Sequence, residues 1–282
     1  MWPPKLACCN FIPKVEHLRQ FALDLGLQGV DWTIDRSSLP LDPAQEQELA
    51  AKIYRLQPLE VRLHVALPGL DLGDDDPHQA RLSAQVFQQL CRLAARLRLH
   101  YLTIHLGLGR ETTASLEWET ALEQLQALVV FASRFWIRIC LENLAWGWTS
   151  RPDLYEKLLR KTGAWATFDL GHAQVCHAVT STQYTVADFV LPQPERIVNA
   201  HVYHLEDERG HLPPNSLADL APRLDLLRSL PLCDWWVLEL HDEAALRQTL
   251  HIVQEYLHYQ ANRTDLPGCP GILPLSAPDP SV

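Results

Sequence analysis

Side chains that bind metals and transfer protons stand at the ends of six apolar runs in this sequence. They are His64, His105, Glu142, Asp169 with His172 just after it, His204 and Glu239. A lone histidine in such a place usually serves as a cap, and Asp169 alone could cap the helix that follows it. Glu142 and Glu239 lie among large apolar residues, where an unpaired carboxylate costs several kcal/mol. We therefore favour the interpretation that these side chains form one shared site over the interpretation that each has a separate structural role.

The residue types in this set suit a divalent cation. Two glutamates, an aspartate and a histidine offer oxygen ligands and one imidazole, which fit Mn²⁺, Co²⁺, Zn²⁺ or Mg²⁺ without choosing among them. In the Asp-x-x-His stretch, Asp169 can bind from a strand end while His172 reaches in from the loop. We expect one divalent cation and no nucleotide cofactor.

The apolar runs alternate with amphipathic segments, which predicts buried parallel strands separated by helices. The runs span residues 5–10, 29–34, 61–66, 101–107, 137–143, 164–170, 197–205 and 235–240. Asp42-Pro43 and Asp76-Pro77 predict helix starts, and Gly163 predicts a helix end. No Gly-x-Gly-x-x-Gly follows a strand, which disfavours an open doubly wound sheet. The pattern predicts a single (β/α)8 TIM barrel over residues 1–260, with its functional residues at the carboxyl ends of the strands.

Composition limits the classes of function. The net charge of −10 argues against a general nucleic-acid binder. No stretch of about 18 uncharged apolar residues predicts a membrane span, and the start "MWPPKLACCN" lacks the apolar region of a signal peptide. The seven cysteines include no Cys-x-x-Cys pair and predict no disulfide framework. We expect a cytoplasmic protein whose proline-rich residues 261–282 form a surface-draped or disordered tail.

The order of the motifs resembles that of the xylose isomerase-like TIM barrels. This superfamily contains sugar and sugar-phosphate isomerases and epimerases, and AP endonucleases of the endonuclease IV type (AP endonuclease family 2). The resemblance covers residues 1–260 and rests on "ICLENLAWG", "TFDLGHA", "HLED" with the later "HLPP", and "VLELH". Glu142, Asp169, His204 and Glu239 follow one another at spacings of 27, 35 and 35 residues. The set is specific for the superfamily and not for a substrate.

The resemblance implies a metal held by Glu142, Asp169, His204 and Glu239. In the epimerase branch the two glutamates also exchange a substrate proton, so Glu142 and Glu239 would be the acid/base pair. The cation would polarise a hydroxy-carbonyl group and stabilise an enediolate. The predicted function is therefore a metal-dependent isomerase or epimerase that acts on a small carbohydrate, either a sugar or a sugar phosphate. We expect no contact with a membrane. Whether the chain forms a homo-oligomer is left open.

Further residues are candidates for contacting the substrate or a second metal. They are His64, His105, His172, His211, Trp146 and Trp148. The tryptophans could stack on a sugar ring or plug the barrel mouth, and Trp32 is open to the same two readings. Asp31 stands where the family often has an acidic residue. If the substrate carried a phosphate group, Arg110 or Arg151 would have to bind it.

The stretch "HVYHLEDERGHLPP" contains three histidines within residues 201–214. Strand alternation puts His204 on one face and His201 on the other, which predicts His204 as the ligand and turns His201 toward the helical layer. Asp207 would orient the ligand imidazole. His211 would lie on the lip, near the substrate or a second metal.

Two other functions remain open. His64, His105 and Glu142 match the pattern by which the endonuclease branch builds a three-zinc cluster. That branch uses an Asp-x-His for its third zinc, but Arg209 stands in the Asp position here and leaves His211 without its partner. A phosphodiester hydrolase with two metals therefore remains possible, while nucleic acid is disfavoured. A non-catalytic barrel used as a binding or assembly partner should show broken ligands, and all four predicted ligands are present.

Overall fold

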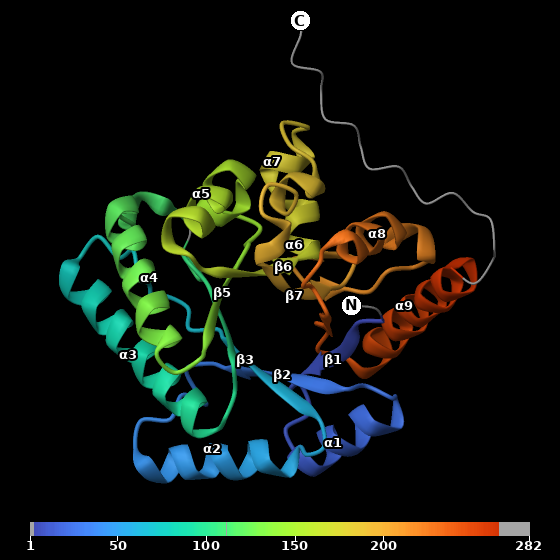
Figure 1. Ribbon diagram of the computed structural model, residues 1–282, viewed down its shortest axis with the longest axis horizontal. Coiled ribbons are helices and arrows are strands. Elements are labelled where there is room, and N and C mark those ends of the chain that lie inside the picture. Colours follow the sequence, from blue (N-terminus) through green and yellow to red (C-terminus); the bar gives the residue numbers. More distant parts are fainter. Residues whose placement is uncertain (1–2, 111, 265–282) are drawn as a thin grey trace, which may run out of the picture.

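The barrel that the apolar runs predict is present. The computed structural model describes residues 3–110 and 112–264. In this part of the chain, eight parallel strands close into a barrel in the order β1-β10-β7-β6-β5-β4-β3-β2. Figure 1 shows the helices as a ring around these strands. The prediction of a (β/α)8 barrel is confirmed.

The strands coincide closely with the predicted runs. The barrel strands are β1 (Lys5–Cys9), β2 (Gly29–Ile34), β3 (Glu60–Val65), β4 (Tyr101–Ile104), β5 (Arg138–Glu142), β6 (Trp165–Asp169), β7 (Ile197–Val202) and β10 (Trp235–Leu238). A small antiparallel hairpin of β8 (Leu205–Asp207) and β9 (Gly210–Leu212) follows β7. β7 thus ends at Val202, although the apolar run predicted a strand as far as residue 205.

The helices begin and end where local chemistry predicts. They are α1 (Val15–Asp24), α2 (Pro43–Arg55), α3 (Pro77–Arg96), α4 (Trp118–Ser133), α5 (Pro152–Thr162), α6 (Leu170–Val175), α7 (His177–Thr180), α8 (Ala221–Ser229) and α9 (Glu243–Thr264). The side chain of Asp42 accepts hydrogen bonds from the first turn of α2, and Asp76 caps α3 in the same way. Gly163 ends α5 in the left-handed conformation with φ 74°.

The carboxyl-terminal helix extends beyond its predicted end at Gln260. α9 continues to Thr264, so the first residues of the predicted tail are helical. Residues 265–282, on which the rest of the tail prediction falls, lie outside the described residues. Between residues 3 and 264, no helix described in the structure has both the length and the apolar character to cross a membrane.

Successive strand residues alternate between the barrel interior and the helical layer, and this alternation builds the interior in layers. In the middle layer the hydroxyl groups of Thr103 and Thr167 lie 2.8 Å apart, and Asn199 Nδ2 donates to Thr167 Oγ1 at 3.0 Å. One interior position further along β6 and β7 come Asp169 and His201, which pair in the register of the two strands. Both therefore lie in the layer at the carboxyl ends of the strands.

The amino-terminal end of the barrel is filled by Arg62 and Trp235. Arg62 Nε lies 3.3 Å from Glu60, Nη1 donates to the Val198 carbonyl at 3.2 Å, and the guanidinium stacks over the Trp235 ring at 4.4 Å. Trp235 in turn covers Gly29, where a Cβ atom would lie 2.1 Å from the indole. Only glycine fits at that position of β2.

Candidate metal centre

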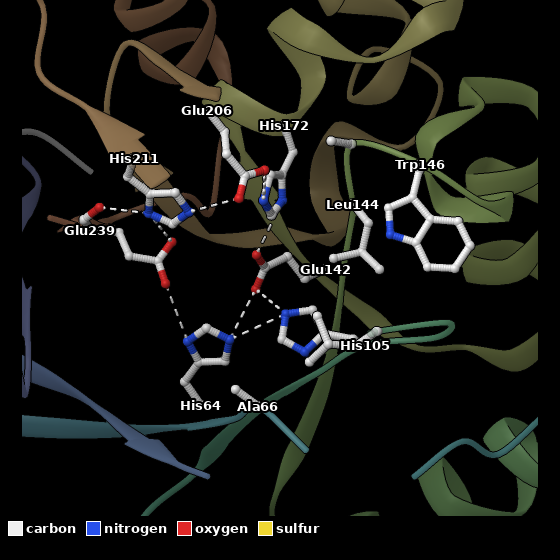
Figure 2. A pocket seen from close by; sticks show the side chains of 12 residues that line it. His64, Ala66, His105, Glu142, Leu144, Trp146, His172, Glu206, His211 and Glu239 are labelled. Carbon is white, nitrogen blue, oxygen red and sulfur yellow. Dashed lines mark hydrogen bonds and ion pairs between the residues drawn. The ribbon is translucent and has the colours of Figure 1, made fainter. Parts of the chain in front are cut away.

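A cavity of about 290 Å³ opens at the carboxyl ends of the strands, where Figure 2 shows its lining side chains. One part of the wall is polar and consists of His64, His105, Glu142, His172, Glu206, His211 and Glu239. The other part is apolar and consists of Ala66, Leu108, Leu144, Ala145 and Trp146. The cavity thus brings together side chains from β3, β5, α6, the β8–β9 hairpin and the loops that follow β3, β4, β5 and β10.

The first group of potential ligands combines Glu142, Asp169, His201 and Glu239, all of them buried. His201 Nδ1 lies 2.9 Å from Glu239 Oε2, 3.3 Å from Glu142 Oε1 and 3.6 Å from Asp169 Oδ2. One ligand atom from each residue lies within 4.8 Å of the others. The three carboxylates are those predicted from the sequence, whereas the histidine is not.

The structure does not bring His204 to these carboxylates, so its predicted place among them is wrong. The chain leaves the strand after Val202, and His204 turns toward α8, where its Nδ1 lies 3.1 Å from Arg223 Nη2. Its carbonyl also accepts a hydrogen bond from Arg223 at 2.6 Å. His201 faces the barrel interior instead of the helical layer. Strand alternation cannot be extended to residue 204 because the strand has already ended.

Asp207 does not orient an imidazole as predicted. Its carboxylate accepts hydrogen bonds from the Arg209 backbone at 2.8 Å and from Arg209 Nη2 at 2.6 Å, within the turn of the β8–β9 hairpin. The side chain is 35% exposed. Its role is to shape this turn.

The second group consists of His64, His105 and Glu142, which are also buried. Glu142 Oε2 lies 3.2 Å from His105 Nε2 and 3.4 Å from His64 Nε2, and the two imidazole nitrogens are 3.3 Å apart. Glu142 therefore offers Oε1 to the first group and Oε2 to the second. Figure 2 shows it between His172 and the His64–His105 pair.

The third group consists of His172, Glu206 and His211 at the rim of the cavity. Glu206 and His211 are paired across the β8–β9 hairpin, whose turn contains Gly210 at φ 96°. His172 Nε2 lies 3.1 Å from Glu206 Oε2, and His211 Nε2 lies 3.8 Å from Glu206 Oε1. The inference that His211 has no acidic partner is wrong, because Glu206 supplies the carboxylate that the Arg209 position does not.

Three of the histidines are oriented by backbone carbonyl groups. His105 Nδ1 lies 3.1 Å from the Val65 carbonyl, and His172 Nδ1 lies 2.9 Å from the Asn143 carbonyl. His211 Nδ1 lies 2.8 Å from the carbonyl of Glu239. A proton on Nδ1 of each ring satisfies these carbonyls, so Nε2 is the nitrogen of each ring that points to the ligand groups.

Several buried polar atoms of the site form no hydrogen bond within the described part of the chain. They are Asp31 Oδ2, His64 Nδ1, Glu142 Oε2, Asp169 Oδ2, both ring nitrogens of His201, and Glu239 Oε2. Buried polar atoms are rarely left without partners, since each one costs free energy. A divalent cation would satisfy carboxylate and imidazole atoms that converge in this way. The donor set therefore fits a metal ion.

The pKa values of the site reflect the same crowding of charge. Burial opposes charge on His201, but Glu142 and Glu239 raise the pKa of its imidazole well above the usual value. Burial likewise opposes charge on His172, yet Asp169 and a hydrogen bond to Glu206 raise its pKa to about 10. Burial also opposes charge on Glu142, but the neighbouring imidazoles hold the pKa of its carboxyl group well below the usual range. Imidazolium protons thus balance the carboxylates wherever no cation does.

The other residues predicted for the site are divided between the cavity and the core. Trp146 lines the apolar wall. Trp148 packs edge-on against Trp118 at 5.1 Å between ring centroids, so its predicted place at the substrate is not supported. Arg110 pairs with Asp74 and Arg151 with Asp153, and neither arginine lines the cavity.

Comparison with known proteins identifies the family. Residues 19–256 match the family described as "Xylose isomerase-like TIM barrel", and the chain belongs to it. A curated relative is the uncharacterized protein MJ0008 of Methanocaldococcus jannaschii, which is 32% identical over 157 residues. The match covers 56% of this chain and 66% of that protein, less than two thirds of its length.

Solved structures with the same fold are named as sugar epimerases and as an endonuclease. A D-tagatose 3-epimerase-like protein has a TM-score of 0.72 at 17% identity, covering 92% of this chain and 99% of its own. L-ribulose 3-epimerase has a TM-score of 0.70 at 14% identity, covering 95% and 100%. Endonuclease IV from Thermus thermophilus has a TM-score of 0.59 at 18% identity, covering 91% and 100%. At such identities the likeness establishes the fold.

Proposed function

We propose that the protein is a metal-dependent hydrolase of phosphoester bonds whose barrel mouth holds two or three divalent cations. The observation that carries the proposal is the sharing of Glu142 between two ligand groups, one oxygen to each, beside a third group at the rim. Adjacent cations that share a carboxylate recur in phosphoester hydrolases, where they hold both ends of an in-line displacement. The fold of endonuclease IV, which this chain shares, is compatible with that chemistry.

Each ligand group would hold its cation through a different balance of nitrogen and oxygen. His64, His105 and Glu142 provide two imidazoles and one carboxylate, a set typical of catalytic zinc. The group that contains His201 has three carboxylates and one imidazole. The group that contains Glu206 has two imidazoles and one carboxylate. When bound, the cations would supply Lewis acidity and neutralise the charge of a phosphoryl group.

The residues of the chain itself would position the substrate and exclude water. Among the residues that line the cavity in the described structure there is no lysine or arginine, so cations and imidazolium groups must balance the charge of a phosphate. Trp146, Leu108 and Leu144 form the apolar side and would receive the organic part of the ester. The carbonyls of Val65 and Asn143 hold His105 and His172 with Nε2 toward the cavity. The site would thus be preorganised for its ligands.

A sugar isomerase or epimerase is the second candidate. It is favoured by the placement of Glu142 and Glu239, which both line the cavity and both approach His201 Nδ1, at 3.3 Å and 2.9 Å. Two such carboxylates could remove and return a proton next to a carbonyl group. His64 and His105 weigh against it, because they occupy the oxygen of Glu142 that does not face His201.

The two candidates are separated by testing both reactions on the same preparation. The protein, loaded with Zn²⁺ or Mn²⁺, is incubated with p-nitrophenyl phosphate, bis(p-nitrophenyl) phosphate and an oligonucleotide containing an abasic site. In parallel, a panel of ketoses and ketose phosphates in D₂O is followed by NMR. The proposal expects phosphoester cleavage that a chelator abolishes and Glu142→Gln loses. Deuterium incorporation next to a carbonyl, without cleavage of any ester, would favour the epimerase instead.

A further inference from the structure

Asp31 lies beneath the two buried ligand groups and, with one residue from each of them, His64 and His201, forms a further set of three side chains close enough to hold a metal ion. It stands in the middle of β2, its side chain is buried, and its Oδ2 forms no hydrogen bond among the described residues. Oδ2 lies 3.5 Å from His64 Nδ1 and 3.7 Å from His201 Nε2. One carboxylate oxygen therefore faces two imidazoles that belong to different ligand groups.

His201 presents one nitrogen to a ligand group and the other to Asp31, whereas Nδ1 of His64 lies near two carboxylates. His64 turns Nε2 to Glu142, at 3.4 Å, and its Nδ1 lies 3.5 Å from Asp31 Oδ2 and 3.5 Å from Glu239 Oε1. His201 turns Nδ1 to Glu142 and Glu239, and Nε2 to Asp31. The rings lie 5.0 Å apart between centroids. Asp31 Oδ2 thus faces one nitrogen of each ring, and Glu239 is a second carboxylate near the nitrogen of His64.

His64 and His201 also differ from the other three histidines of the site. His105, His172 and His211 each direct Nδ1 to a backbone carbonyl, which decides the nitrogen that carries the proton. Neither nitrogen facing Asp31 has a hydrogen-bond partner within the described ranges. An imidazole that binds a metal almost always donates its second N–H to an acceptor, and a carboxylate is a common one. Asp31 lies within reach of one nitrogen of each ring, whereas Glu239, the other carboxylate near His64 Nδ1, belongs to the ligand group of His201.

We propose that Asp31 is a positioning residue that accepts a hydrogen bond from Nδ1–H of His64 and from Nε2–H of His201, and so prepares two adjacent metal sites at once. The proposal rests on the metal sites proposed above and not on the reaction. A cation bound among Asp31, His64 and His201 is a weaker alternative, because each imidazole would then have to bind metals through both nitrogens and lose both ring protons. If Asp31 acts only as a hydrogen-bond acceptor, each imidazole binds a metal through one nitrogen and keeps the proton on the other.

The test compares Asp31→Asn with the wild-type protein in metal binding and in the hydrogen bonds of the histidine N–H groups. Asn has the same shape but offers one acceptor oxygen and no charge, so it cannot serve two N–H donors equally. Co²⁺ titrated into metal-stripped protein should bind about tenfold or more weakly at two sites. The site of His172, Glu206 and His211 should keep its affinity. Asp31→Ser, which is smaller and cannot overpack the barrel, should give the same pattern.

Long-range ¹H–¹⁵N NMR of the Zn²⁺-loaded proteins gives the readout that a structural role would not change. In the wild type, His64 should carry its proton on Nδ1 and His201 on Nε2. In Asp31→Asn the N–H proton signals of these two rings should shift, because they lose their carboxylate acceptor, while those of His105, His172 and His211 should not. Asp234→Asn is the matched control, because it removes a carboxylate 3.5 Å from Arg62 at the opposite end of the barrel. It should change neither readout.

Unchanged affinity together with unchanged ring nitrogens in both Asp31 variants would overturn the proposal. Weakened affinity with unchanged N–H signals of His64 and His201 would also overturn it, since it would reduce Asp31 to a remote charge. A wild-type protein that binds Co²⁺ at these sites but cleaves no phosphoester would contradict the proposed function alone. The role of Asp31 would still be decided by the two readouts.

Discussion

The two ends of the barrel bury charge in opposite ways. At the amino-terminal end, Arg62 is almost completely buried, and its three nitrogens reach Glu60, the Val198 carbonyl and Asp234. Its guanidinium also stacks on Tyr101 at 3.8 Å. At the carboxyl end, Glu142, Asp169, His201 and Glu239 are equally buried, but each leaves atoms without a hydrogen bond in the described structure.

This difference separates a structural charge from a ligand site. When the hydrogen-bonding groups of a buried charge all have partners, the charge adds little stability by itself. Removing one of those partners is nevertheless strongly destabilising. Carboxylates and imidazoles that converge without hydrogen bonds are costly to the fold, so their convergence fits a site for an ion or a substrate. Substitutions at the amino-terminal end should therefore change stability, and substitutions at the carboxyl end should change metal binding.

The largest effect is expected for Glu142→Gln. Because Glu142 serves two ligand groups, its loss should remove both cations and lower phosphoester hydrolysis by about a thousandfold or more. Metal content by inductively coupled plasma mass spectrometry and initial rates measure the two effects. A variant that retains metal and turnover would contradict the sharing of this carboxylate.

At the other end, Arg62→Met should reduce the free energy of unfolding by about 3 kcal/mol, because the partners of a buried charge are left unpaired. Urea denaturation of metal-free protein measures this loss. The metal content of the folded variant should not change. Arg55→Met is the control, since its pair with Glu16 is exposed and should leave the unfolding midpoint where it is. Loss of metal in Arg62→Met would break the distinction between the two ends.

Within β7 and its loop, His201→Ala and His204→Ala form a matched pair. His201 contributes to a ligand group, so its removal should weaken metal binding by about a hundredfold. His204 faces Arg223 on the outside of the barrel, so its removal should leave metal affinity unchanged. Competition with a chromophoric chelator measures both. The reverse order of effects would restore the prediction made from strand alternation.

A smaller effect is expected from pH at the rim group. The pKa of His172 is raised to about 10 in the metal-free protein, above the usual value for histidine, so a cation must displace its proton at neutral pH. Metal affinity should therefore rise as the pH increases toward about 10 and fall in acid. The same shift stabilises the metal-free fold below the usual histidine pKa, and this contribution is lost as the pH rises through about 10. Calorimetric titration in buffers of different ionisation enthalpy should show proton release, and its absence would contradict the assignment.

Much of the fold and about half of the residues that the structure gathers at the candidate site could be predicted from the sequence. Strands buried on both faces are continuous apolar runs, so all eight were located, and Glu142, Asp169 and Glu239 were found because those runs end at them. His201 was missed because the apolar pattern runs on through Tyr203 to Leu205, whereas the strand ends at Val202. The end of a strand depends on its neighbours, which composition does not reveal.

Glu206 was missed, and Asp31 was noted only through the family resemblance, for different reasons. Glu206 meets His211 only through the register of a hairpin, which the turn at Gly210 determines. That turn, with "DERG" between short alternating stretches, is the signal that could have been used. Asp31 lies within its strand, so a rule that looks for chemistry at strand ends passes over it. Layers of interior residues would have been a better guide than strand ends alone.

The most direct measurement of the central claim is the number of metal ions bound per chain. Metal-stripped protein is dialysed against excess Zn²⁺, freed of unbound ions, and analysed by inductively coupled plasma mass spectrometry beside His64→Ala and Glu206→Gln. We expect two to three ions in the wild type, with one fewer in each variant. No ion above background, or a single ion that neither variant removes, would contradict the claim that the barrel mouth is a multinuclear metal centre.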